Sequence, residues 1–167
     1  FCWDTHLTKI KGRNVLFIVN ASNRYTIAMT DIEPRNWNYY TMYIRSVIHG
    51  VMQEMGYSEN QIGQYFKMSG DTTVTKTHGR KLVGGINRMV MDAQYFGKKL
   101  EKEAKYQWEL SEYLNRDICQ PEGFDAYGYP SELFKLDMER LGIISKRKPA
   151  KIIDFTRYID TNRSSNH

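Results

Sequence analysis

The chain has 167 residues, of which 41% are hydrophobic and 13% aromatic; this is enough for one buried core and excludes a disordered chain. No apolar stretch approaches the roughly 20 residues of a membrane-spanning helix, and Cys2 and Cys119 have neither zinc-site nor disulfide-framework spacing, so we expect reduced thiols in a cytoplasmic protein. The net charge of +5 permits an acidic partner such as nucleic acid.

The first 32 residues read as an antiparallel meander. Short apolar and β-branched runs alternate with turn residues at 11–13 and 21–24. The second run is apolar on both faces, which indicates a central strand with a core on each side. The predicted strands are 3–10, 15–20 and 25–32.

About five helices are expected after the meander. Apolar residues at helical spacing between Trp37 and Met55 form the clearest stripe, and Gly56 is placed to end that helix. Ser58 with Gln61 predicts the start of a short second helix. A strand follows at 72–77, then a long helix at 79–105 weakened by Gly84, Gly85 and Gly97, and two further helices at 106–116 and 132–141.

These elements predict an α+β fold. The small, mostly antiparallel sheet would contain the N-terminal meander and the strand near 72–77, packed with about five helices. Residues 1–142 form one domain in this interpretation. A basic extension, 143–167, either packs on that domain or is partly flexible.

The junction at Thr75–Arg88 is the most informative segment for function. A threonine-rich strand there turns near Gly79 into a helix whose first turn contains Arg80 and Lys81. Cations are unfavourable at a helix N-terminus, because the free backbone N–H groups already carry the positive end of the helix dipole. A phosphate, a partner's carboxylate or an internal acidic side chain would offset them.

Basic and aromatic residues continue along the predicted long helix. Five of them are spaced by seven, seven, four and three residues and so lie on one side of that helix: Lys81, Arg88, Tyr95, Lys99 and Lys102. A surface that tracks phosphates and offers a ring for stacking has this pattern, and so has an ordinary solvated face. The candidate anion- and nucleic-acid-binding residues are Lys76, Thr77, Arg80, Lys81, Arg88, Tyr95, Lys99 and Lys102.

Candidate catalytic residues are few. Asp4 and His6 are two apart on one strand, so a carboxylate there could orient an imidazole, and His78 is a further candidate base. A surface pair and a turn residue are the structural alternatives. Metal-site, P-loop and nucleophile-elbow motifs do not occur, so the sequence predicts no cofactor or metal and favours a binding protein over an enzyme.

Several short segments together resemble a known family. They are Phe1-Cys2-Trp3, Gly12-Arg13-Asn14, Asn20–Arg24, the Thr75-Lys76-Thr77 run with Arg80, Gly84 and Asn87, and Tyr129-Pro130. The chain resembles, over roughly residues 1–141, a bacterial and phage family of unknown function whose members also occur before plasmid ORF-3-like domains. The resemblance implies a small α/β domain and no established activity.

A small, basic, stand-alone member of such a family is typical of phages and mobile elements. By this analogy we expect a non-enzymatic inhibitor of host defence in the host cytoplasm, most concretely an anti-CRISPR protein that binds a Cas9-type effector with its guide RNA. RNA or DNA alone is another possible partner. The alternatives are an enzyme acting on phosphodiesters and a self-assembling toxin–antitoxin or regulatory module.

Overall fold

The computed structural model describes residues 1–32, 39–76 and 79–145. The described chain begins with the predicted meander, a three-stranded antiparallel sheet in the order β1-β2-β3. Ile10 pairs with Arg13 across a two-residue turn, and both turn residues, Lys11 and Gly12, have positive φ angles of 49° and 82°. A tight turn of this kind matches the twist of the strands and fixes their register. The strands are β1 (Trp3–Ile10), β2 (Arg13–Asn20) and β3 (Thr26–Thr30).

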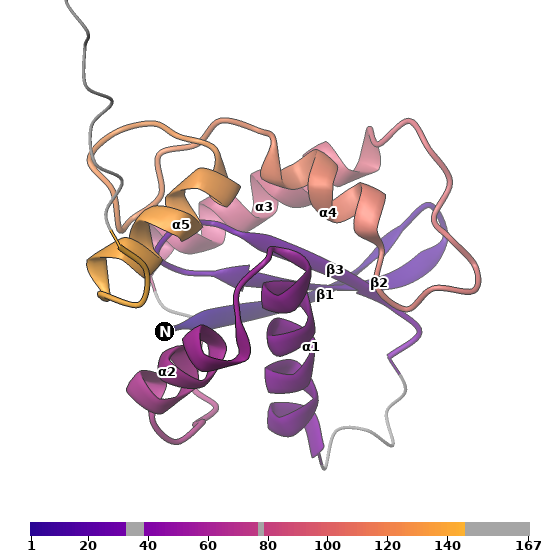
Figure 1. Ribbon diagram of the computed structural model, residues 1–167. Helices are drawn as coiled ribbons and strands as arrows, with labels where there is room; N and C mark the ends of the chain where they lie inside the picture. The colour runs from indigo at the N-terminus through magenta and orange to yellow at the C-terminus, as the bar shows by residue number, and fades with distance from the viewer. Residues whose placement is uncertain (33–38, 77–78, 146–167) are drawn as a thin grey trace, which may run out of the picture.

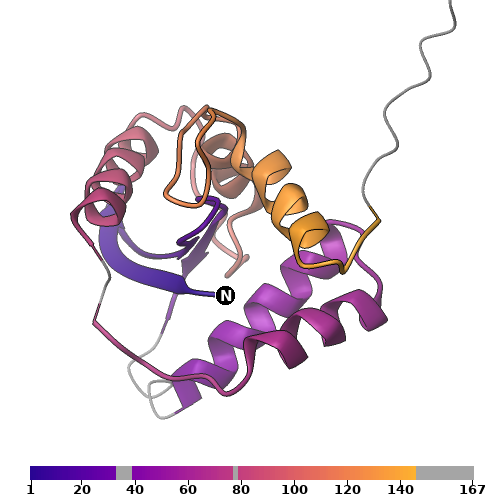
Figure 2. The same cartoon turned by 90° about the vertical axis from the view of Figure 1, so that its left-hand side faces the viewer.

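Helices cover both faces of this sheet, as Figures 1 and 2 show. One face packs against the first, second and last helices, and the other packs against the third and fourth. The α+β prediction with five helices is therefore confirmed for the described residues. The helices are α1 (Tyr40–Glu54), α2 (Glu59–Ser69), α3 (Arg80–Gln94), α4 (Trp108–Asn115) and α5 (Pro130–Arg140).

β2 lies between two hydrophobic cores, as its sequence predicts. Leu16 and Ile18 point into the core with α1, α2 and α5, whereas Val15, Phe17 and Val19 point into the core with α3 and α4. Successive side chains of a strand alternate between faces, so an uninterrupted apolar run is what a strand buried on both sides requires.

The outer edge of β3 is paired by α4 and by the backbone of residues 105–107 just before it, and not by one of the other two strands. The N-cap residue Gln107 and the helical residues Ser111 and Asn115 are four residues apart and line one side of the helix. The amide of Asn115 binds both backbone groups of Thr26, at 2.8 and 2.7 Å. The backbone N–H of Ala28 donates to the Ser111 hydroxyl at 3.0 Å, and its carbonyl accepts from the backbone N–H of Gln107 at 2.9 Å. This polar stripe satisfies backbone groups that would otherwise remain buried and unpaired.

The strand predicted near 72–77 is wrong for the residues that the structure describes. Residues 72–76 are exposed and belong to no strand, and Thr77 lies outside the described residues. Threonines alternate there as in a strand, but Val74 alone is strongly apolar, and it is 74% exposed. A strand without an apolar face gains little from joining a sheet. Arg45 of α1 instead holds the segment by donating to the Thr72 hydroxyl at 3.0 Å.

The predicted long helix at 79–105 is also wrong in length, because α3 ends at Gln94. Lys11, in the turn between β1 and β2, donates hydrogen bonds to the carbonyl oxygens of Phe96 and Lys98. Phe96 and Leu100 then turn into the core. Gly97, between them, is a poor helix residue, so the tertiary contacts decide where the helix stops.

The final helix starts slightly earlier than predicted, at Pro130, with Tyr129 as its N-cap residue. Pro suits the first helical position, because its missing N–H would have no intrahelical partner there. The basic extension enters the described part of the chain only at 143–145. Residues 146–167 lie outside it.

Candidate nucleic-acid interface

The candidate catalytic residues Asp4 and His6 lie on the β1 face that packs against α3 and α4. They pair across the sheet with Val19 and Phe17, which belong to that core. Asp4 is buried, and its carboxylate accepts from the Cys2 thiol at 3.9 Å. His6 is half-buried, and His78 lies outside the described residues. A catalytic role for these residues stays a prediction.

The predicted anion site falls at the start of α3. Arg80 and Lys81 occupy its first turn, and the N-cap residue Gly79 has a φ of 76°, a conformation that glycine adopts without strain. The first turn contains no acidic residue. Lys76 is exposed just before this junction, and Thr77 lies outside the described residues.

The remaining predicted residues do not share one helix face. Arg88 projects from α3 with 78% of its side chain exposed, and Tyr95, at the end of α3, is also 78% exposed. Lys99 and Lys102 lie in the irregular segment that follows. These two lysines therefore do not lie on the predicted helix face, because α3 ends before them.

The β1–β2 hairpin forms hydrogen bonds with the segment that contains Lys99 and Lys102 and holds that segment beside its own basic residues. Besides the two bonds from Lys11, Arg13 donates to the Glu101 carbonyl at 2.7 Å, and Gln94 donates to the Lys9 carbonyl at 2.9 Å. The Gln107 side chain then fixes the 101–104 turn by binding both backbone groups of Glu101, at 2.8 and 2.9 Å. We define the basic end as Lys9, Lys11, Arg13, Lys98, Lys99, Lys102 and Lys105.

Part of the positive charge at the basic end is available to a partner. Arg13 pairs with Asp31 at 2.6 Å and Lys98 pairs with Glu109 at 2.5 Å. Lys99, Lys102 and Lys105 are exposed and form no ion pair with another described residue. Glu101 and Glu103 are the carboxylates within this segment. The surface therefore carries excess positive charge on backbone that hydrogen bonds hold in place.

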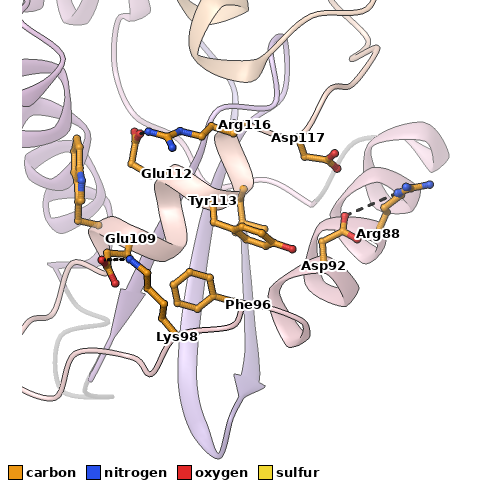
Figure 3. A pocket seen from close by; sticks show the side chains of 11 residues that line it. Arg88, Asp92, Phe96, Lys98, Glu109, Glu112, Tyr113, Arg116 and Asp117 are labelled. Atoms are coloured by element: carbon orange, nitrogen blue, oxygen red, sulfur yellow. Dashed lines mark hydrogen bonds and ion pairs between the residues drawn. The ribbon is translucent and has the colours of Figure 1, made fainter.

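A groove between α3 and α4 adjoins the basic end, is open to solvent and has a volume of about 580 Å³. Its floor is aromatic: the Phe96 and Tyr113 rings lie 5.4 Å apart, and Tyr113 is 42% exposed. Figure 3 shows these two rings between the Lys98–Glu109 pair and the Arg88–Asp92 pair. Trp108, at 41% exposure, also lines the groove.

The charges around the groove are nearly balanced. Besides the Lys98–Glu109 pair, Arg116 binds Glu112 at 3.2 Å and the Arg88–Asp92 distance is 3.9 Å. Asp117 is exposed and forms no hydrogen bond through its carboxylate and no ion pair with any described residue. The groove thus combines stacking surface with one carboxylate that has no cationic side chain bound to it.

Arg24 lies next to this groove, because it lines a small neighbouring pocket together with Asp92 and Asp117, which also line the groove. Its guanidinium donates to the Gly85 carbonyl of α3 at 2.6 Å. Burial lowers the pKa of Arg24, although the nearby Cys119, Asp117 and Asp92 oppose that shift. Burial also raises the pKa of the Cys119 thiol, which therefore stays protonated and unreactive at neutral pH. Cys2 and Cys119 are both free, as predicted.

Gly85 leaves room for the Arg24 side chain, which gives a packing reason for one of the three glycines that weaken the predicted long helix. A Cβ at residue 85 would lie 1.7 Å from an Arg24 nitrogen, whereas a Cβ at Gly84 meets no atom within 4 Å. We expect Gly85→Ala to lower the free energy of unfolding by about 1–2 kcal/mol, because Arg24 must move and lose a charged hydrogen bond. Urea denaturation would measure it.

Gly84→Ala is the matched control for this experiment. It should raise the stability by up to about 1 kcal/mol, because alanine is the better helix former and nothing obstructs its methyl group. Equal stabilisation by both substitutions would show that Arg24 does not need the space above residue 85.

Neither a metal site nor a membrane-spanning helix occurs in the part of the chain that the structure describes. No group of three or more His, Cys, Asp or Glu side chains there is arranged to hold a metal ion. Within the same residues, no helix is long and apolar enough to span a bilayer.

Comparison with known families identifies one family for this chain. Residues 1–133 match the model of a family described as "Domain of unknown function (DUF6933)", and the chain belongs to that family. The match confirms that the chain belongs to a family of unknown function, as the sequence resemblance implies, and it attaches no activity to that family. The bacterial or phage origin stays a prediction. Searches of curated proteins and of solved structures found no match.

Proposed function

We propose that this protein is a non-enzymatic binding protein that engages RNA or a ribonucleoprotein through its basic end. The main support for this proposal is the contact between the β1–β2 hairpin and the segment that follows α3. Lys11 and Arg13 bind the backbone of residues 96–101 and so bring two lysine-containing segments together. Clustered lysines neutralise phosphates and release counterions, which is the main source of affinity for a nucleic-acid backbone.

The adjoining groove supports a nucleic-acid partner over a purely acidic protein. Single-stranded nucleic acids are bound by combining a basic track with exposed aromatic rings on which bases stack. Lys98 belongs to the basic end and also lines the groove that contains Tyr113 and Trp108. Backbone and bases of one strand would therefore find complementary surfaces side by side.

More specifically, we propose that this protein comes from a phage or mobile element and inhibits a Cas9-type effector in the host cytoplasm. Such an effector carries a guide RNA, whose exposed backbone is a dense line of negative charge. The basic end would bind that backbone and thereby interfere with the assembly or action of the effector.

A pull-down from bacterial lysate that contains a guide-loaded Cas9 tests this proposal. We expect the tagged protein to capture the effector with its guide RNA, and ribonuclease treatment to abolish the capture. Capture of bulk RNA alone would support RNA binding and contradict the anti-CRISPR form. Capture of neither RNA nor effector would contradict the proposal as a whole.

A further inference from the structure

We propose that the groove between α3 and α4 binds a single unpaired guanine base of the RNA strand whose phosphates lie on the basic end. This inference rests on the proposed function and specifies what the groove recognises. The two surfaces are continuous, because Lys98 lines the groove while its own carbonyl is held by Lys11 of the hairpin.

The groove suits a base better than a phosphate. It is lined by four carboxylates, those of Asp92, Glu109, Glu112 and Asp117, against the three cations Arg88, Lys98 and Arg116. Three of these carboxylates are paired with those cations and the fourth is not, so the groove itself carries a slight excess of negative charge, which disfavours a phosphate inside it. Between the ion pairs lies the exposed ring of Tyr113, tilted by 51° against Phe96. A flat, neutral heterocycle would stack there.

Asp117 supplies the polar contact that selects among bases. An ionised carboxylate only accepts hydrogen bonds, through two oxygens side by side. Guanine presents two adjacent donors, N1–H and the N2 amino group, on its Watson–Crick edge. In adenine and cytosine the amino group stands beside a ring nitrogen that accepts, and in uracil the single N–H stands between two carbonyl oxygens. A carboxylate is therefore complementary to guanine and repelled in part by the other three bases.

Hydrogen bonds to the sheet and its turn hold both walls of the groove, α3 and α4, in place. The polar stripe of α4 fixes that helix to β3, and Asn115 in this stripe is two residues from Tyr113 and from Asp117. On the opposite wall, α3 is tied to the β2–β3 turn by the bond from Arg24 to the Gly85 carbonyl. The ring and the carboxylate are thereby positioned before a base arrives, which reduces the entropy lost on binding.

Fluorescence anisotropy with labelled heptaribonucleotides tests the inference. One probe contains seven uridines, a second has guanosine at the central position, and a third has inosine there, which lacks the N2 amino group. We expect the guanosine probe to bind about tenfold more tightly than the uridine probe, with inosine between them. Asp117→Asn should abolish this preference and leave the affinity for the uridine probe nearly unchanged. Tyr113→Ala should weaken the binding of all three probes.

The control is Asp125→Asn, which makes the same charge change at an exposed loop position outside the groove. It should keep the full preference for guanosine. Equal affinity for the three probes, or a preference that survives Asp117→Asn, would overturn the guanine site; the proposed function would stand if the uridine probe still bound through the basic end. Absence of binding to every probe would overturn both.

Discussion

Replacing Asn115 with leucine is expected to lower the free energy of unfolding by about 3 kcal/mol. The side chain is buried and binds the backbone N–H and the carbonyl of Thr26 at 2.8 and 2.7 Å. Leucine has a similar volume but leaves both groups of Thr26 buried without a partner, and each such loss costs about 1–3 kcal/mol. Urea denaturation followed by circular dichroism would measure the change.

Asn60→Leu is the control for this prediction, because Asn60 is exposed in α2 and forms no comparable contact. Its effect should stay within about 0.5 kcal/mol. A loss below about 1 kcal/mol for Asn115→Leu would mean that water or neighbouring groups satisfy Thr26, and that α4 does not replace a fourth strand energetically.

The double variant Lys99→Glu with Lys102→Glu is expected to weaken RNA binding about thirtyfold. Each reversal removes one attraction to phosphate and adds one repulsion, and four such changes of about 0.5 kcal/mol each amount to roughly 2 kcal/mol. Both lysines are exposed, so the fold should be unaffected. Anisotropy with a labelled single-stranded RNA of mixed sequence measures the affinity.

A second double variant, Lys67→Glu with Lys135→Glu, changes the net charge equally on α2 and α5. It should reduce the affinity no more than about threefold, because these lysines lie outside the basic end and act only through the long-range field. Equal losses for the two double variants would show that RNA responds to total charge and not to this surface.

Local patterns in the sequence predicted much of the fold. The apolar run of β2 identifies a central strand, and Ser58 with Gln61 forms the capping box that its spacing indicates. The end of α3 was not predictable in this way. It depends on Lys11, a turn residue more than 80 positions earlier, whose contacts at 96–98 leave no periodic signal in the sequence.

The candidate site was predicted only in part. Tyr95, Lys99 and Lys102 are exposed as expected, but the hairpin brings the lysines together, not a helix face. The groove was missed because Tyr113 belongs to α4 and Asp117 follows the end of α4, and nothing in the spacing shows that α3 and α4 lie side by side. One usable signal was present: Gln107, Ser111 and Asn115 repeat every four residues, which indicates a polar helix face directed at backbone groups.

The salt dependence of RNA binding tests the central claim most directly. The logarithm of the association constant should fall linearly with the logarithm of the salt concentration, and the negative slope should be smaller by about two for the Lys99→Glu, Lys102→Glu variant than for the native protein. That result would place two phosphate contacts at the basic end. An unchanged slope, or native binding that does not depend on salt, would contradict the account.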